Sequence, residues 1–152
     1  MKRTIIYLIA LMAATSVWAQ HMDFCGVELS GHVRDITEKM RKAGFKLKEK
    51  RTDQNFYIFE GMFCGHTTFL NVNFTPKTKT VYQVRVTPRA VNEVVLVDSL
   101  VARYGSEFAE TEEGLSWATE QGGIFYIKRD NYDPFIIIMD AAGVEQLKEE
   151  KK

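Results

Sequence analysis

One pattern of segments occurs twice along this chain, and each copy is a helical segment followed by four short strand-like segments. The helices are predicted over residues 31–43 and 90–104. Alternation of apolar and polar side chains is clearest in residues 66–74 and 80–87. The segments between strands are short, so consecutive strands are expected to pair antiparallel. The eight predicted strands are FKLKEKR, NFYIFEGMF, HTTFLNVNF, TVYQVRVT, SEFAETE, LSWATE, GIFYIKRD and PFIIIMD.

Each predicted helix carries an apolar stripe that would face a sheet. Ser30 is the predicted N-cap of the first helix, Gly44 fits the left-handed position that ends many helices, and Gly105 is the predicted stop of the second helix. The stripe of the first helix is Val33, Ile36, Met40 and Ala43. The stripe of the second helix is Val94, Val97, Val101 and Tyr104.

The two copies are expected to form one domain, because a half of about sixty residues could scarcely bury one face of its own sheet. The predicted fold class is therefore α+β, with two tandem repeats of a helix and an antiparallel meander. The repeats would share one curved sheet, and the helices would pack on one face of it. The single domain is predicted over residues 20–152, with repeats at about 30–88 and 89–141 and a C-terminal helix at about 142–152.

The first nineteen residues are predicted to be a secretory signal peptide. Lys2 and Arg3 precede an apolar stretch over residues 5–14, and the small-residue exit follows at residues 17–19. That apolar stretch is about half the length that a membrane-spanning helix needs. We therefore expect cleavage before Gln20, a periplasmic or secreted mature chain, and no stable membrane anchor.

Charge and motifs narrow the possible functions. Removal of residues 1–19 would take away two basic residues and leave 18 basic against 20 acidic residues. Such a balance argues against nucleic acid as a partner, because nucleic-acid binding needs a basic stripe. The chain has no glycine-rich phosphate loop, no GxSxG, no HExxH and no dinucleotide fingerprint. No catalytic residue and no cofactor are therefore predicted.

Two cysteines lie in the same local setting, Phe-Cys-Gly, at Cys25 and Cys64. An even number of cysteines in an oxidising compartment favours a disulfide, and closing a loop of about forty residues would stabilise the fold by roughly 4 kcal/mol. The alternative is a pair of unlinked thiols. Cys64 and His66 could form a thiolate and base pair if both lay on one strand. The spacings of Cys25, His32, Cys64 and His66 match no familiar zinc pattern, so no metal site is predicted.

The tandem order of one helix and four strands resembles the architecture of the β-lactamase inhibitor protein family. The stretch LVARYG, a tryptophan twelve residues beyond Gly105 in LSWATE, and the following IFYI are also similar to a pattern in small exported bacterial proteins. This resemblance implies an exported protein whose curved sheet presents a concave surface to a protein target. It carries over no individual target-contacting residue.

An antiparallel sheet that is covered on one side leaves its other side open for binding. We expect a non-catalytic binding module that recognises an envelope or extracellular protein, or a peptide, through this open face. A small-ligand carrier and, less favoured, a cysteine-dependent enzyme are the alternatives. The residues predicted to line the binding surface are Phe69, Asn71, Asn73, Gln83, Arg85, Tyr126 and Lys128. The residues predicted to line the pocket of a carrier are Phe74, Val84, Val97 and Val101.

Overall fold

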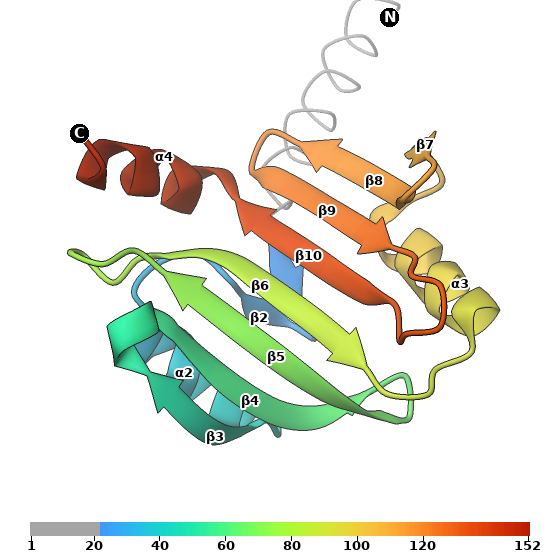
Figure 1. The fold of residues 1–152 in the computed structure, drawn as a ribbon, viewed down its shortest axis with the longest axis horizontal. Helices are drawn as coiled ribbons and strands as arrows, with labels where there is room; N and C mark the ends of the chain where they lie inside the picture. The colour runs from blue at the N-terminus through green and yellow to red at the C-terminus, as the bar shows by residue number, and fades with distance from the viewer. Residues whose placement is uncertain (1–21) are drawn as a thin grey trace, which may run out of the picture.

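The computed structural model describes residues 22–152, so the predicted signal peptide lies outside the described residues. Eight antiparallel strands form one sheet in the order β3-β4-β5-β6-β10-β9-β8-β7 (Figure 1). Each predicted strand segment forms one of them. Their bounds are β3 Lys46–Arg51, β4 Phe56–Phe63, β5 His66–Phe74, β6 Val81–Pro88, β7 Ala109–Thr111, β8 Gly114–Thr119, β9 Gly122–Ile127 and β10 Phe135–Asp140.

The two repeats meet at the centre of the sheet, where the last strand of each repeat pairs with the other. In this seam Ile136 of β10 lies opposite Val86 of β6, and Ile138 lies opposite Val84. Because each repeat contributes four consecutive strands, neither half has to close its own sheet. The predicted α+β fold with one shared sheet is confirmed.

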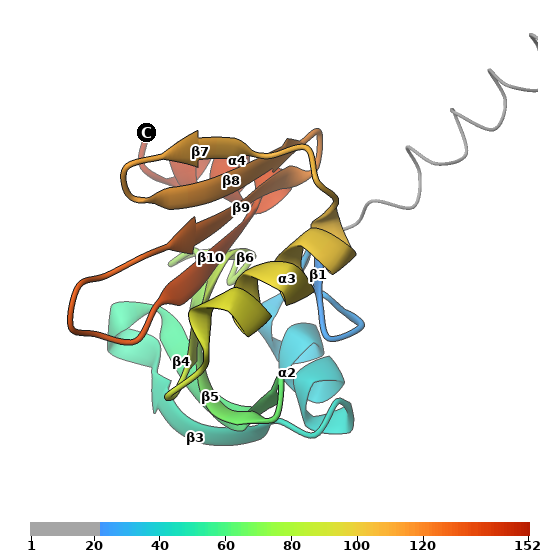
Figure 2. The same ribbon diagram turned by 90° about the vertical axis from the view of Figure 1, so that its right-hand side faces the viewer.

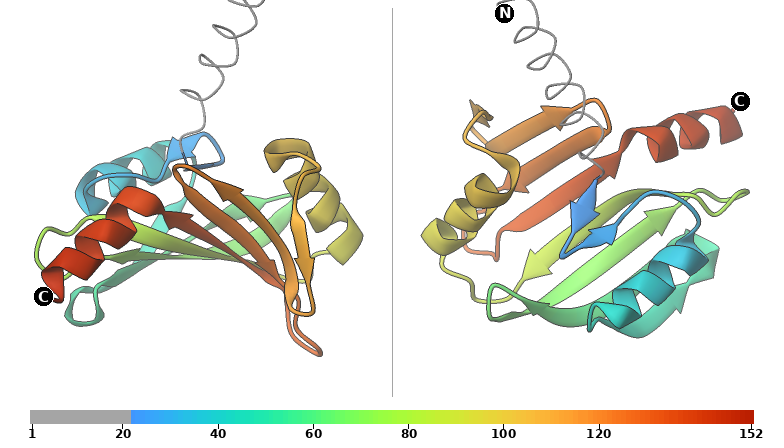
Figure 3. Two further views of the ribbon diagram at one scale, coloured as in Figure 1. Left: turned by 90° about the horizontal axis from the view of Figure 1, so that it is seen from above. Right: turned by 180° about the vertical axis from the view of Figure 1, so that it is seen from behind.

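The helices α2 (Val33–Lys42) and α3 (Glu93–Tyr104) cover the same face of the sheet. Both lie behind the sheet in Figure 1 and in front of it in the right-hand view of Figure 3. Figure 2 shows the β3–β4–β5 end of the sheet curving around α2. The opposite face, toward the viewer in Figure 1, carries no helix. No helix among residues 22–152 is long and apolar enough to cross a membrane.

Both helices begin later than predicted, because other residues cap them. The side chain of His32, rather than that of Ser30, accepts the backbone N–H of Arg34, while the Ser30 hydroxyl donates to Glu28. Asn92 caps α3 by accepting from the N–H of Val94. Gly44 and Gly105 follow the helices with φ of 92° and 96°, as predicted.

The core lies between the sheet and the two helices. Apolar residues of the central strands β5, β6 and β10 point into it and are at most 2% exposed. Val33, Ile36 and Met40 of the predicted α2 stripe are buried, whereas Ala43, its fourth predicted member, is exposed. Of the predicted stripe of α3, Val97, Val101 and Tyr104 pack against the core, whereas Val94 is exposed and the fully buried residues are Leu96 and Leu100. The core residues of the three central strands are Leu70, Val72, Phe74, Val81, Val84, Val86, Ile136 and Ile138.

A two-stranded hairpin of β1 (Asp23–Phe24) and β2 (Val27–Glu28) lies between α2 and α3 in the right-hand view of Figure 3. The Phe24 ring is buried against the rings of Phe45 and Phe63, with centroids 6.0 Å and 4.9 Å away. Asp23 accepts from Arg103 of α3 at 2.7 Å, and its carbonyl accepts from the Tyr104 hydroxyl at 3.1 Å. The hairpin therefore ties α3 to the rest of the core.

The C-terminal helix α4 (Ala141–Glu150) begins where β10 ends and packs on β6. Asp140 caps it by accepting from the N–H of Gly143 at 2.9 Å. At its other end, the Glu150 carboxylate accepts from the backbone N–H groups of Lys77 and Thr78 at 2.7 Å and 3.0 Å. The Thr78 hydroxyl donates to the same carboxylate at 2.6 Å. Both ends of α4 are thus held to the body.

Candidate binding surface on the open sheet face

Five of the seven predicted surface residues share the sheet face that carries no helix. Asn71 lies opposite Arg85, and Asn73 lies opposite Gln83, across the β5–β6 pair. Phe69 is two residues from Asn71 on the same strand, so its side chain points to the same face. Because their neighbours along β5 and β6 are core residues, these five side chains point away from the helices.

Tyr126 and Lys128 were predicted on the open face, and this prediction is wrong. Tyr126 is 2% exposed, and its hydroxyl donates to the Glu93 carboxylate of α3 at 2.8 Å. Lys128 Nζ lies 3.4 Å from the same carboxylate. Both side chains therefore lie on the helix-covered face.

Burial and the hydrogen bond set the ionisation of the Tyr126–Glu93 pair. Burial raises the pKa of Tyr126, and its hydrogen bond to Glu93 raises it further. The hydrogen bond from Tyr126 lowers the pKa of Glu93. The pair thus consists of a neutral hydroxyl donor and a carboxylate acceptor at neutral pH, and it ties β9 to α3.

Strand pairing explains the misplacement of Tyr126. Residues 124–127 are all apolar or aromatic, so β9 has no alternation to reveal which face each residue takes. In the structure Ile124 lies opposite Trp117, which is buried, and Tyr126 lies opposite Leu115. Phe125 and Ile127 therefore take the open-face positions.

Three arginines stack on three aromatic rings at one end of the open face. The guanidinium carbon of Arg85 lies 4.0 Å from the ring centroid of Phe135. That of Arg129 lies 4.6 Å from the Tyr132 ring, and that of Arg89 lies 5.2 Å from the Phe69 ring. These distances are within the range of cation–π attraction. We refer to Phe69, Arg85, Arg89, Arg129, Tyr132 and Phe135 as the arginine–aromatic cluster.

Antiparallel pairing brings the cluster together from four parts of the chain. The end of β6 lies beside the starts of β5 and β10, and the β9–β10 loop supplies Arg129 and Tyr132. Two hydrogen bonds hold the segment after β6 in place. The Arg89 N–H donates to the Thr67 carbonyl at 2.8 Å, and the Ala90 N–H donates to Asp133 at 3.0 Å. The cluster is therefore built on ordered backbone.

The cluster combines free positive charge with half-buried apolar surface. Within residues 22–152, none of its three guanidinium groups has a carboxylate within ion-pairing distance. Arginine and aromatic side chains are the types most enriched at energetically dominant interface positions. The half-buried apolar residues beside the cluster on this face are Ile58, Phe125, Ile127, Ile137 and Met139.

The predicted disulfide is absent, and both cysteines are free and half-buried. Each is the first residue of a two-residue hairpin turn, in which Cys25 and Gly26, and Cys64 and Gly65, have positive φ. The repeated Cys-Gly sequence therefore corresponds to two tight turns of the same kind rather than to a cross-link. Cys64 Sγ lies 3.4 Å from the hydroxyl of Ser99. Burial raises the pKa of the Cys25 thiol.

The structure also removes the basis of the proposed thiolate and base pair. Cys64 lies in the turn with φ 51°, whereas His66 is the first residue of β5, so the two do not alternate along one strand. Among residues 22–152 no group of three His, Cys, Asp or Glu side chains is placed to hold a metal ion. Of the residues predicted to line the pocket of a carrier, Phe74 and Val84 are packed in the core.

Sequence reasoning missed four cluster residues: Arg89, Arg129, Tyr132 and Phe135. Arg89 and the β9–β10 loop residues lie outside strands, so no alternation could assign them to a face. The one available signal was the density of arginine and aromatic residues around residues 129–135. No protein-family model, curated protein or solved structure matches this chain.

Proposed function

We propose that the chain is an exported, non-catalytic binding module that recognises an acidic segment of an envelope or extracellular protein through the arginine–aromatic cluster. The observation that carries this proposal is the presence of three guanidinium groups, each stacked on a ring and without a carboxylate partner in the described part of the chain, on a sheet face without a helix. A carboxylate-bearing partner would supply the missing counter-charges.

The geometry of the cluster favours specific binding of a carboxylate through directed hydrogen bonds, rather than non-specific attraction between opposite charges. A guanidinium group can bind a carboxylate through two parallel hydrogen bonds, and these are stronger than neutral hydrogen bonds. Stacking on Phe69, Tyr132 and Phe135 limits the freedom of the arginine side chains before binding. Less conformational entropy is then lost when the partner docks. The neighbouring apolar side chains would be buried by the same contact.

The test uses purified mature protein as bait in an envelope extract, followed by titration with the captured partner after that partner has been purified. The variant that removes the cluster charges is Arg85→Ala, Arg89→Ala and Arg129→Ala. We expect it to weaken affinity by about a hundredfold or more, because three interface residues that each contribute about 1 kcal/mol give about 3 kcal/mol in total, and about 2.8 kcal/mol corresponds to a hundredfold.

The matched control removes three other surface charges: Lys39→Ala, Lys42→Ala and Lys148→Ala. Lys39 and Lys42 lie on α2, which covers the other face of the sheet, and Lys148 lies on α4, which extends beyond the end of β10. We expect the control to bind within a few fold of wild type. Equal weakening by both variants would show that only net charge matters, and no weakening by the cluster variant would remove the cluster as the recognition surface.

Export is a separate part of the proposal, and it rests on residues 1–19 alone. We expect the protein recovered from the envelope or medium to begin at Gln20 when its N-terminus is sequenced. Recovery of the intact N-terminus from the cytoplasm would refute export and leave the binding surface to be tested on its own.

A further inference from the structure

A hollow of about 320 Å³ lies on the helix-covered side of the molecule, far from the cluster in the fold. It lies between α2 and the curved β3–β4–β5 end of the sheet, which is visible in Figure 2. Its volume is at the lower end of the range for small-molecule sites. The residues around it are His32, Val33, Arg34, Thr37, Glu38, Arg41, Lys50, Thr52, Tyr57, Phe74 and Lys79.

Two aromatic rings form the apolar part of this hollow. Tyr57 and Phe74 meet edge to face, with ring centroids 5.0 Å apart. Phe74 is 1% exposed and fixed in the core, whereas Tyr57 is half-buried and keeps part of its ring accessible. An aromatic or other flat ring could stack on this accessible part.

Positive charge surrounds the rings. Lys50 Nζ lies 5.5 Å from the Tyr57 centroid, and Lys79 Nζ lies 5.4 Å from the Phe74 centroid. Lys79 also donates to the side-chain oxygen of Asn55 at 3.3 Å. Neither lysine has a carboxylate within ion-pairing distance in residues 22–152. Two ammonium groups therefore face the hollow without a counter-charge from the described chain.

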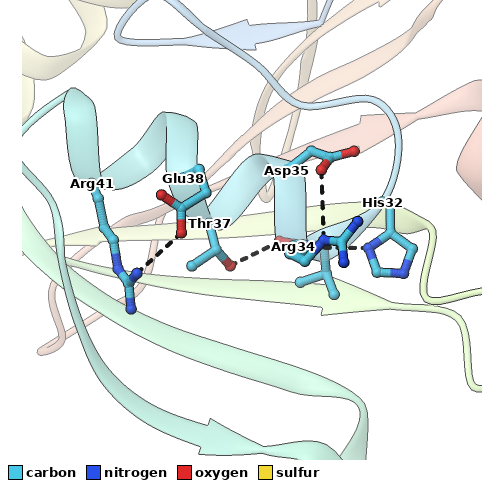
Figure 4. A network of polar contacts seen from close by, with 7 residues as sticks. His32, Arg34, Asp35, Thr37, Glu38 and Arg41 are labelled. Carbon is cyan, nitrogen blue, oxygen red and sulfur yellow. Dashed lines mark hydrogen bonds and ion pairs between the residues drawn. The ribbon is translucent and has the colours of Figure 1, made fainter.

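The charged side chains of α2 around the hollow are paired with one another. Figure 4 shows His32, Arg34, Glu38 and Arg41 along the helix. Glu38, the one acidic residue that lines the hollow, pairs with Arg41 at 3.1 Å. Arg34 lies 4.0 Å from the Asp35 carboxylate, so both arginines have an acidic partner and the positive charge of the hollow comes from Lys50 and Lys79.

The backbone around the hollow is fixed before any ligand arrives. Lys50 of β3 lies directly opposite Tyr57 of β4, so the two side chains share a face. The Lys79 carbonyl accepts from the N–H of Val33 at 2.9 Å, and this bond ties the β5–β6 turn to the start of α2. The ring and the two ammonium groups are therefore held by three elements that are bonded to one another.

We infer that this hollow is a binding site for a small organic anion that carries a flat ring. The ring would stack on Tyr57, and the anionic group, a carboxylate, phosphate or sulfate, would lie between Lys50 and Lys79. Either part alone would use only half of the site. The site is independent of the open face, so the chain would bind a small molecule and a protein on opposite sides of its sheet.

The test is a titration of the folded mature protein with phenyl phosphate, followed through its backbone amide resonances. Inorganic phosphate provides the anion without the ring, and benzyl alcohol provides the ring without the anion. We expect phenyl phosphate to shift the resonances of residues 50, 57 and 79 with a dissociation constant of about 1 mM or lower. Each partial probe should bind at least about tenfold more weakly.

Variants then separate the two halves of the site. Lys50→Ala with Lys79→Ala should weaken phenyl phosphate about tenfold or more, and Tyr57→Leu should remove its advantage over inorganic phosphate. Lys39→Ala with Lys42→Ala removes the same charge from a part of α2 that does not line the hollow, and it should leave binding within about twofold. A dispersed amide spectrum confirms that each variant is folded.

Three results would overturn the inference. The first is the absence of saturable shifts at the highest soluble concentration of phenyl phosphate. The second is equal binding of inorganic phosphate and phenyl phosphate by the wild-type protein. The third is equal weakening by the two lysine pairs, which would show attraction to net charge rather than a site.

Discussion

At the residue scale, Cys25 and Cys64 each occupy the first position of a two-residue hairpin turn, and neither forms a disulfide. Parity and compartment favoured a cross-link, but the backbone places Cys25 and Cys64 in turns with φ of 51° at each. A hairpin turn of two residues needs positive φ at both positions, and this accounts for the glycine that follows each cysteine. The repeated Phe-Cys-Gly sequence could therefore have been read as two hairpins.

Free cysteines predict a specific chemical result. Thiol titration of denatured, unreduced protein should find two free thiols per chain. Cys25→Ser and Cys64→Ser should each change the free energy of unfolding by about 1 kcal/mol or less, since no loop closure is lost. The structure would be contradicted if no free thiol were found and if each serine variant lost about 4 kcal/mol in its free energy of unfolding, as expected for loss of a disulfide.

Tyr126 gives a second prediction at this scale, because its face was assigned wrongly from sequence. Tyr126→Phe removes one hydrogen bond to Glu93 and should lower the free energy of unfolding by about 1 kcal/mol. Tyr126→Ala should lower it by about 3–5 kcal/mol, as for other buried aromatic residues. Denaturant unfolding measures both. Tyr132→Phe is the control, because this side chain is 68% exposed, and it should leave the free energy of unfolding unchanged. If Tyr126→Ala also left the free energy of unfolding unchanged, Tyr126 would not be buried between β9 and α3.

At the element scale, strands with alternating residues were predicted well, and apolar runs were not. The faces of β5 and β6 followed from alternation, because a period of two leaves one assignment. In α3, Val94, Val95, Leu96 and Val97 are all apolar, so the sequence pattern does not show that Leu96 is buried while Val94 is exposed. Val94 is 67% exposed. In a continuous apolar run, packing against the sheet determines which residues are buried.

At Gly143, α4 lies too close to β6 to leave room for a side chain. A Cβ at this position would lie 2.1 Å from the Val81 carbonyl oxygen and 2.7 Å from the Tyr82 Cα. Helix propensity alone would make Gly143→Ala stabilising by up to about 1 kcal/mol. The close approach instead predicts destabilisation by about 1–3 kcal/mol in denaturant unfolding. A stabilised variant would show that α4 does not pack there.

At the other end of α4, the contact that Glu150 makes with Lys77 and Thr78 should depend on pH. Desolvation raises the pKa of Glu150, but hydrogen bonds from the Thr78 hydroxyl and the N–H groups of Lys77 and Thr78 outweigh it and lower the pKa to about 2. The contact therefore contributes stability above the ordinary pKa of 4.5 and loses it as the pH falls toward about 2.

The amide resonance of Thr78 reports this contact directly. In wild type it should titrate with a midpoint near pH 2, well below 4.5. Glu150→Gln should abolish this titration, whereas Glu149→Gln, one residue away on the exposed side, should leave it intact. A wild-type midpoint at 4.5 would mean that the end of α4 is detached in solution.

At the scale of the whole molecule, the tandem pattern was enough to predict one sheet with helices on one side. It predicted the bare face as well, because two helices on one face leave the other uncovered. It could not predict the arginine–aromatic cluster, whose members come from residues 69 to 135 and meet only when the repeats join. The hollow beside α2 likewise exists only after β3, β4 and the β5–β6 turn have assembled.

Recognition through the open face can be measured in the living source cell with a photoreactive amino acid placed at single positions of the chain. At Asn71, in the middle of the open face, we expect a specific cross-link to one protein. At Val95, an exposed position of α3 on the helix-covered side, we expect none. A cross-link from Val95 with none from Asn71 would contradict recognition through the open face.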